Sequence, residues 1–116
     1  MIKMPKPKSC SVCCIAMLTD KSFDEAIDLC FKETPKDFSM DFDAMEAALN
    51  KGKLKTIRLE KTPEVFTKNT LIECRHKIKR YWHYIVYDTE QQTFLDPIPN
   101  PPPISEYQFH RVIEIE

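Results

Sequence analysis

The spacing of apolar residues changes at Gly52, the only glycine among the 116 residues of the chain. Before Gly52, apolar residues recur every three or four positions, which is the spacing of one face of an α-helix. After it, short runs rich in aromatic and β-branched residues are separated by polar turns, as is typical of β-strands. Helices followed by strands predict an α+β fold with an antiparallel sheet.

Three helices with recognisable ends are predicted in the first half. The first runs from about residue 10 to residue 18, with Ser9 as a candidate N-cap. The sequence SFDE at 22–25 fits a capping box that opens the second. The third spans 41–52, and Gly52 is expected to end it in the left-handed conformation. The expected buried positions are Val12, Ile15, Ala16 and Thr19, then Ala26, Ile27, Cys30 and Phe31, then Phe42, Met45 and Leu49.

The second half predicts five strands and one extended connection. The sequence NPPP at 100–103 must be a connection, because proline cannot donate to a central ladder. A chain of 116 residues supports one hydrophobic core, so residues 1–116 are expected to form a single domain. The predicted strands are 54–59, 70–74, 81–88, 92–97 and 107–115.

Composition excludes several classes of protein. Hydrophobic residues make up 42% and charged residues 30%, a balance typical of globular proteins. With 17 basic and 18 acidic residues, the chain lacks the basic excess that nucleic-acid binding requires, and CRHKIKR at 74–80 is interpreted as a solvated face or loop. The apolar run 12–18 is too short to cross a bilayer, so no membrane partner is predicted. We expect a cytoplasmic protein whose five cysteines remain thiols.

Three residues form a candidate catalytic group. Cys10 lies in the first turn of the first predicted helix, where the helix dipole favours a thiolate. A hairpin with its loop at residues 89 and 90 would pair His83 with Asp96, placing their Cβ atoms about 4.5–5.5 Å apart. A carboxylate on one ring nitrogen fixes the histidine tautomer and leaves the other nitrogen free to act as a base. A nucleophile, a base and an orienting acid are the groups that acyl transfer needs. The same register pairs Tyr84 with Leu95 and Ile85 with Phe94.

Two segments of the chain carry motifs in the order of a known family. The segment SCSVCCIAMLTDKSFDEAI at 9–27 has a cysteine before an Ala-Met-Leu helix, and HYIVYDTEQQTFLDP at 83–97 has a histidine opening one strand and an Asp-Pro closing the next. Both resemble papain-like cysteine peptidases of the bacteriocin-processing, double-glycine type. The resemblance implies a papain-like fold and a peptidase or amidase that needs no cofactor or metal. In that family's scheme Cys10 is the nucleophile, His83 the general base and Asp96 the orienting acid.

The chain departs from the family pattern at three positions. Ser11 and Asp20 stand where the family usually or often has glycine, and Asp tolerates the left-handed conformation better than most residues. Met4 stands where the family has an oxyanion-stabilising glutamine. Lys6, Lys8 or the backbone N–H of the nucleophile would then have to stabilise the oxyanion, and loss of one such donor typically costs about 10²–10³ in rate.

Other interpretations of these residues remain open. Without the glutamine, the chain could be a papain-like module that binds a peptide or protein partner without cleaving it. The motif CSVC at 10–13 could indicate thiol redox chemistry, although no strand precedes it. A zinc site would need a second ligand pair beside the cysteines. Residues expected to serve packing are Cys13, Cys14, Cys30, Cys74, Trp82 and Tyr84, while His76 and His110 have no predicted partner.

Overall fold

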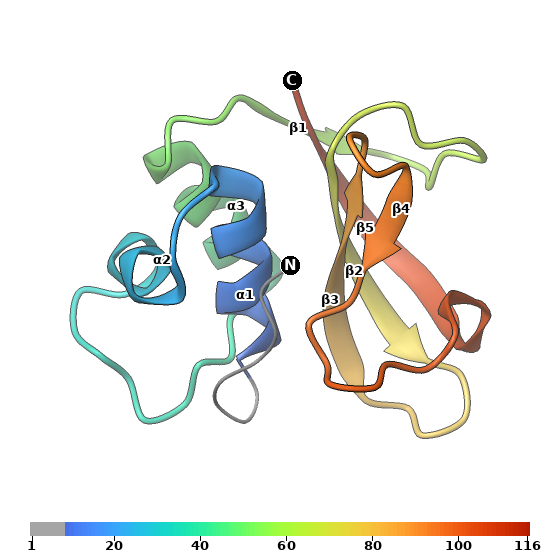
Figure 1. Cartoon of the computed structure of the whole chain (residues 1–116), viewed down its shortest axis with the longest axis horizontal. Coiled ribbons are helices and arrows are strands. Elements are labelled where there is room, and N and C mark those ends of the chain that lie inside the picture. Colours follow the sequence, from blue (N-terminus) through green and yellow to red (C-terminus); the bar gives the residue numbers. More distant parts are fainter. Residues whose placement is uncertain (1–8) are drawn as a thin grey trace.

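Helices fill the first half of the chain and strands the second (Figure 1). The structure, a computed structural model, describes residues 9–116. The α+β class and the approximate positions of the three helices and five strands are confirmed. The elements are α1 (Cys10–Thr19), α2 (Phe23–Cys30), α3 (Phe42–Lys51), β1 (Thr56–Leu59), β2 (Thr70–His76), β3 (Trp82–Asp88), β4 (Thr93–Leu95), a 3-10 turn η1 (Ile104–Glu106) and β5 (Tyr107–Ile115).

The ends of α1 and α2 follow the sequence signals. Asp20 ends α1 in the left-handed conformation with φ 57°, as its side chain permits. The capping box of α2 is confirmed, because Ser22 and Glu25 exchange side-chain and backbone hydrogen bonds of 3.1 Å. Ser9 occupies the N-cap position of α1, but its side chain accepts no hydrogen bond from the first turn.

The prediction that Gly52 adopts the left-handed conformation is wrong. Gly52 has φ −75°, and the positive φ of 68° belongs to Lys53. Glycine is required at position 52 for another reason: a Cβ built there would lie 2.8 Å from Thr19 Cγ2 and 3.3 Å from the Leu49 carbonyl oxygen. Gly52 therefore allows the end of α3 to approach the end of α1.

The five strands form one antiparallel sheet in the order β1-β5-β2-β3-β4. β2 is central, and β5 returns to lie between β2 and β1 instead of beside β4. The β2–β5 pairing shifts so that Glu73 pairs with Arg111 and Cys74 with Phe109. His110 is therefore the extra residue of a β-bulge in β5.

The helices cover one face of the sheet (Figure 1), and the main core lies between these two layers. α1 contacts α2, α3 and β3, so it is buried on nearly all sides. Cys13 and Cys14 are fully buried, which confirms their predicted core positions, whereas Thr19 is only half-buried. On the opposite face of the sheet, a smaller cluster gathers buried and half-buried side chains that include Ile72, Cys74, Ile85, Tyr87, Phe94 and Phe109.

The β3–β4 hairpin has a different register from the one predicted. Val86 pairs with Leu95 and Tyr87 with Phe94, so the expected Tyr84–Leu95, Ile85–Phe94 and His83–Asp96 pairs are wrong by two residues. A two-residue loop needs positive φ at one or both central positions, which Thr89 and Glu90 do not favour. The chain instead uses a four-residue loop, 89–92, with Gln92 at φ 53°. A shift of two residues leaves every side chain on the same face of the sheet.

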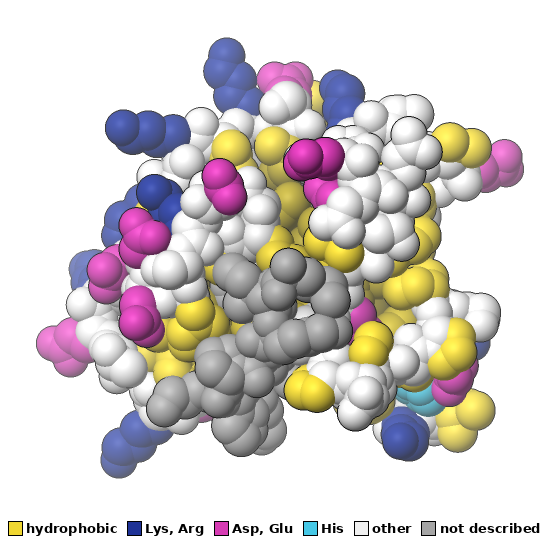
Figure 2. Space-filling view, in the orientation of Figure 1, with side chains coloured by type: hydrophobic (Ala, Val, Ile, Leu, Met, Phe, Trp, Pro, Cys, Tyr) yellow, Lys and Arg dark blue, Asp and Glu magenta, His cyan; other side chains and the backbone are white. Residues whose placement is uncertain are grey.

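Charged side chains are distributed around the molecule without a patch of one sign on the face in Figure 2, where Lys and Arg alternate with Asp and Glu along the helical half. No helix within residues 9–116 has both the length and the apolar character needed to cross a bilayer.

Candidate active site

Cys10 is the first residue of α1, and its half-buried side chain lines a cleft between the helical layer and the sheet. The cleft has a volume of about 570 Å³, within the range of sites for small molecules or short peptide segments. α1, the segment that leads into α3 and strands β2, β3 and β5 all contribute to its walls. The described residues that line it are Cys10, Ser11, Ser39, Met40, Asp41, Phe42, Glu73, Tyr81, Trp82, His83, Tyr84, Ile98 and Arg111.

His83 and Asp96 form a buried pair beside this cysteine. His83 Nε2 lies 2.7 Å from Asp96 Oδ1, and both residues are 4% exposed. Asp96 follows β4 directly, and its Oδ1 also accepts the Ile98 backbone N–H at 3.0 Å. The Tyr107 hydroxyl donates to the other oxygen, Oδ2, at 2.8 Å. The Cys10 side chain lines the same cleft as the His83 ring and interacts with it strongly enough to raise the pKa of His83. The three predicted residues therefore converge despite the altered hairpin register.

The electrostatics of the pair favour a charged imidazolium next to a carboxylate. Burial alone would lower the pKa of His83, but its hydrogen bonds to Asp96 and Cys10 outweigh this effect and raise the pKa to about 9. Burial would likewise raise the pKa of Asp96, yet the hydrogen bond and charge of His83, with the donors Ile98 and Tyr107, lower it below its usual value. Because Asp96 accepts at Nε2–H, the Nδ1 atom of His83 is left for the thiol.

The other cysteines lie in environments that keep them protonated. Burial raises the pKa of Cys13 to about 11 and that of Cys30 to about 12. Burial also raises the pKa values of Cys14 and Cys74, both fully buried. Cys10 therefore differs from the other four in lying partly exposed beside an imidazole.

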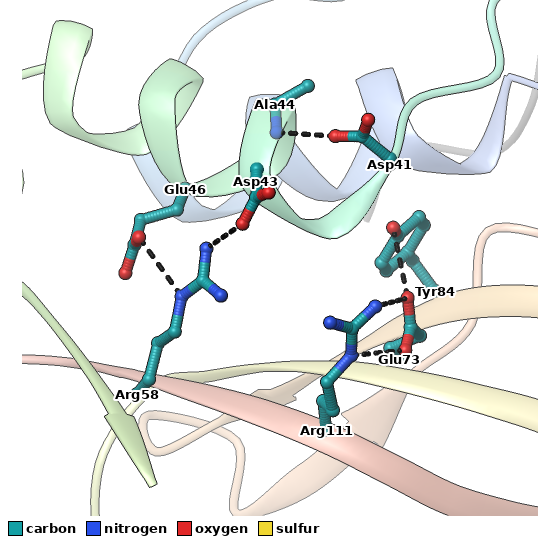
Figure 3. Close-up of polar contacts among 8 residues, drawn as sticks. All are labelled: Asp41, Asp43, Ala44, Glu46, Arg58, Glu73, Tyr84 and Arg111. Atoms are coloured by element: carbon teal, nitrogen blue, oxygen red, sulfur yellow. Dashed lines mark hydrogen bonds and ion pairs between the residues drawn. The ribbon is translucent and has the colours of Figure 1, made fainter.

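A charged group forms another part of the cleft wall (Figure 3). Glu73 on β2 accepts two hydrogen bonds from the Arg111 guanidinium on β5, at 2.9 and 3.1 Å, and its Oε2 lies 3.4 Å from the Tyr84 hydroxyl. The Arg111 guanidinium lies over the Phe42 ring, 4.4 Å from its centroid. No local sequence pattern indicates this group, because the β2–β5 pairing brings Glu73 and Arg111 together.

Two hydrogen bonds fix the segment that leads into α3 against the cleft. The buried Ser11 hydroxyl donates to the Phe38 carbonyl at 2.9 Å, and the Tyr84 hydroxyl donates to the Met40 carbonyl at 3.0 Å. The Ser11 side chain thus has a definite structural partner.

Several predicted roles change with the structure. Trp82, expected in the core, is 53% exposed and lines the cleft beside His83, whereas Tyr84 is buried as expected. The predicted oxyanion residues Lys6 and Lys8 lie outside the described residues, as does Met4.

The remaining histidines have partners that the sequence did not indicate. His76 Nδ1 accepts the backbone N–H groups of Ile78 and Lys79, and Nε2 lies 3.2 Å from Glu106 Oε1. His110 packs edge-on against Trp82, with ring centroids 5.1 Å apart. Between residues 9 and 116, no three His, Cys, Asp or Glu side chains come together in a group that could hold a metal ion.

Comparison with known proteins gives no match: no family model, no curated protein and no solved structure matches this chain.

Proposed function

We propose that this protein is a papain-like cysteine hydrolase that cleaves a peptide or amide bond. The observation that carries the proposal is the position of His83, which is hydrogen-bonded to Asp96 and interacts with the Cys10 side chain in the same cleft. A nucleophile at a helix start, packed against an antiparallel sheet that supplies the base and the acid, supports a papain-like arrangement.

The chemistry follows from the two ring nitrogens of His83. Nε2–H donates to Asp96, so Nδ1 takes the proton of the Cys10 thiol. The thiolate attacks the carbonyl carbon of the substrate and forms a tetrahedral intermediate. His83 then returns the proton to the leaving amine, and a thioester remains on Cys10. Water, deprotonated by His83, hydrolyses the thioester and regenerates the thiol.

Stabilisation of the oxyanion is assigned to the start of α1. The first backbone N–H groups of a helix have no acceptor within the helix and carry its positive dipole end. The N–H of Cys10 is placed there, next to the sulfur that would attack. Lys6 or Lys8 would supply the second donor in place of the family's glutamine.

The proposal is tested by incubating the protein with a defined library of short peptides and analysing the products by mass spectrometry. We expect cleavage products that disappear, with at least a 10³-fold loss of rate, in Cys10→Ser. Cys30→Ser is the matched control, because Cys30 lies on α2 outside the cleft, and it should retain activity. Cleavage that survives in Cys10→Ser would overturn the assignment of the nucleophile.

A second candidate is a papain-like module that binds a peptide or protein partner without cleaving it. The observation that favours it is in the sequence, which has no glutamine before Cys10. In that case a library peptide would bind to the cleft, remain intact, and bind equally well to Cys10→Ser. Binding coupled to cleavage would exclude this candidate.

A further inference from the structure

We propose that Tyr107 is a positioning residue of the site, which holds the Asp96 carboxylate toward His83 and fixes the plane of the His83 ring. The inference rests on the proposed function, since it assigns a role within the same triad. Tyr107 is the first residue of β5, far from both other residues in sequence, and is 4% exposed.

The hydroxyl of Tyr107 determines how the carboxylate lies. Oδ1 of Asp96 receives His83 and the Ile98 backbone N–H, while Oδ2 receives the Tyr107 hydroxyl at 2.8 Å. A rotation of the carboxylate would break bonds at both oxygens. Tyr107 therefore helps to keep Oδ1 facing the imidazole.

The ring of Tyr107 supports the histidine directly. It stacks on the His83 ring with centroids 5.5 Å apart and an angle of 26° between the planes. An aromatic surface against one face of the imidazole opposes rotation of the ring away from Asp96. One side chain thus restrains both members of the base–acid pair.

Tyr107 is itself fixed by residues outside the triad. Its hydroxyl lies 3.4 Å from the Tyr81 hydroxyl, and because its own hydrogen points to the carboxylate, Tyr81 must donate to Tyr107. The edge of His76 contacts the Tyr107 ring, with centroids 5.8 Å apart at 87°. His76 Nδ1 accepts two backbone N–H groups and so carries no proton, which leaves Nε2–H to donate to Glu106. These contacts give Tyr107 a defined orientation.

Within residues 9–116, the titratable groups that face Asp96 include His83 on β3, Tyr107 on β5, Cys14 on α1 and Cys74 on β2. Burial raises the pKa values of Cys14, Cys74 and Tyr107, so these three groups stay neutral at acidic pH. These three groups therefore add no charge to the site as Asp96 titrates at acidic pH.

Removal of the Tyr107 hydroxyl should change the pKa of Asp96 in a definite direction. A donor to the ionised carboxylate lowers its pKa, so Tyr107→Phe should raise the pKa of Asp96. Protonated Asp96 no longer stabilises the imidazolium, so His83 stops activating Cys10 at a higher pH than in the wild type. The pH at which Cys10 loses half of its reactivity on acidification should therefore rise by about one unit.

Two readouts on the whole chain test this role without any substrate. One is the ¹³C shift of the Asp96 carboxyl carbon against pH, assigned by its absence in Asp96→Asn. The other is the rate of Cys10 alkylation by iodoacetamide between pH 3.5 and 8. We expect both profiles to shift upward in Tyr107→Phe and to stay in place in Tyr87→Phe, a hydroxyl removed from the same sheet outside the cleft.

A folded Tyr107→Phe variant with both profiles unmoved would overturn the role of Tyr107. If that variant does not fold, Tyr81→Phe removes the donor to Tyr107 and should give a smaller shift of the same sign; no shift there would also overturn it. Hydrolysis by the wild type without any shift would refute only this role. A shift in a protein that cleaves nothing would support the role and refute the proposed hydrolase.

Discussion

His83 Nε2 lies 2.7 Å from Asp96 Oδ1, and this contact joins a residue in β3 to one that lies just beyond the end of β4. Both side chains are buried, so each charge depends on the other for its stability. The Ile98 N–H and the Tyr107 hydroxyl satisfy the carboxylate further. The charge of His83 is therefore controlled by this one interaction and by the thiol on the other side of the ring.

Replacement of the carboxylate should change the charge of the histidine. In Asp96→Asn the burial of His83 remains while its anionic partner is lost, so its pKa should fall well below 9. NMR titration of the His83 ring measures the change directly. Asp28→Asn, an exposed acidic residue of α2, is the matched control and should leave the titration unaltered. A His83 pKa near 9 in Asp96→Asn would contradict the pairing.

The same contact predicts how stability depends on pH. The pKa of His83 in the folded chain is raised to about 9 from 6.5, so its stabilising contribution is complete below pH 6.5 and is lost as pH rises through 9. The free energy of unfolding of the wild type, relative to Asp96→Asn, should decrease by up to about 3 kcal/mol across that interval. Urea unfolding at pH 6 and pH 9.5 provides the measurement. A constant difference between the two proteins would show that His83 is not charged in the folded state.

The two arginine clusters in Figure 3 should contribute differently to the free energy of unfolding. Glu73 is 8% exposed and accepts two hydrogen bonds from the Arg111 guanidinium, so Glu73→Ala removes a two-bond ion pair whose carboxylate is buried and should cost about 2 kcal/mol. Arg58 pairs with Asp43 and Glu46 at the surface, where such pairs contribute little. Arg58→Ala should therefore cost clearly less in urea unfolding. Equal losses would contradict the difference in burial.

The close contact between the ends of α1 and α3 predicts that a larger residue at position 52 lowers the stability of the folded chain. Gly52→Ala places a Cβ 2.8 Å from Thr19 Cγ2, and the hydrogen bond of the Thr19 hydroxyl to the Ile15 carbonyl resists movement of that side chain. We expect a loss of about 1–3 kcal/mol in the free energy of unfolding. A neutral Gly52→Ala would show that the helix ends have room to separate.

Lys53→Gly relieves a positive φ of 68° and should stabilise the folded chain by up to about 1 kcal/mol.

The sequence predicted the elements well because their signals are local. Apolar spacing, the Ser22–Glu25 capping box and the aromatic strand at 82–88 each depend on neighbouring residues. The pair of His83 and Asp96 was predicted through a hairpin register that is wrong by two residues. The pair survives because an even shift preserves the face of the sheet.

The parts of the site that sequence reasoning missed depend on long-range strand order. Tyr107 reaches the triad, and Arg111 reaches Glu73, because β5 pairs with the central strand β2. No spacing within 107–115 indicates that neighbour, since an alternating strand fits any position in a sheet with one buried face. The exposure of Trp82 was missed for a related reason, because aromatic residues in a strand are usually buried.

The most direct test of the account is the alkylation of Cys10 by iodoacetamide at pH 6, measured by mass spectrometry in the wild type and in His83→Ala. An ordinary thiol is well under 1% thiolate at that pH. Because His83 interacts with Cys10 and is held by Asp96, we expect Cys10 to react at least about tenfold faster than a free cysteine, and to lose this advantage in His83→Ala. A Cys10 that reacts no faster than an ordinary thiol, with no change in His83→Ala, would contradict the proposed triad.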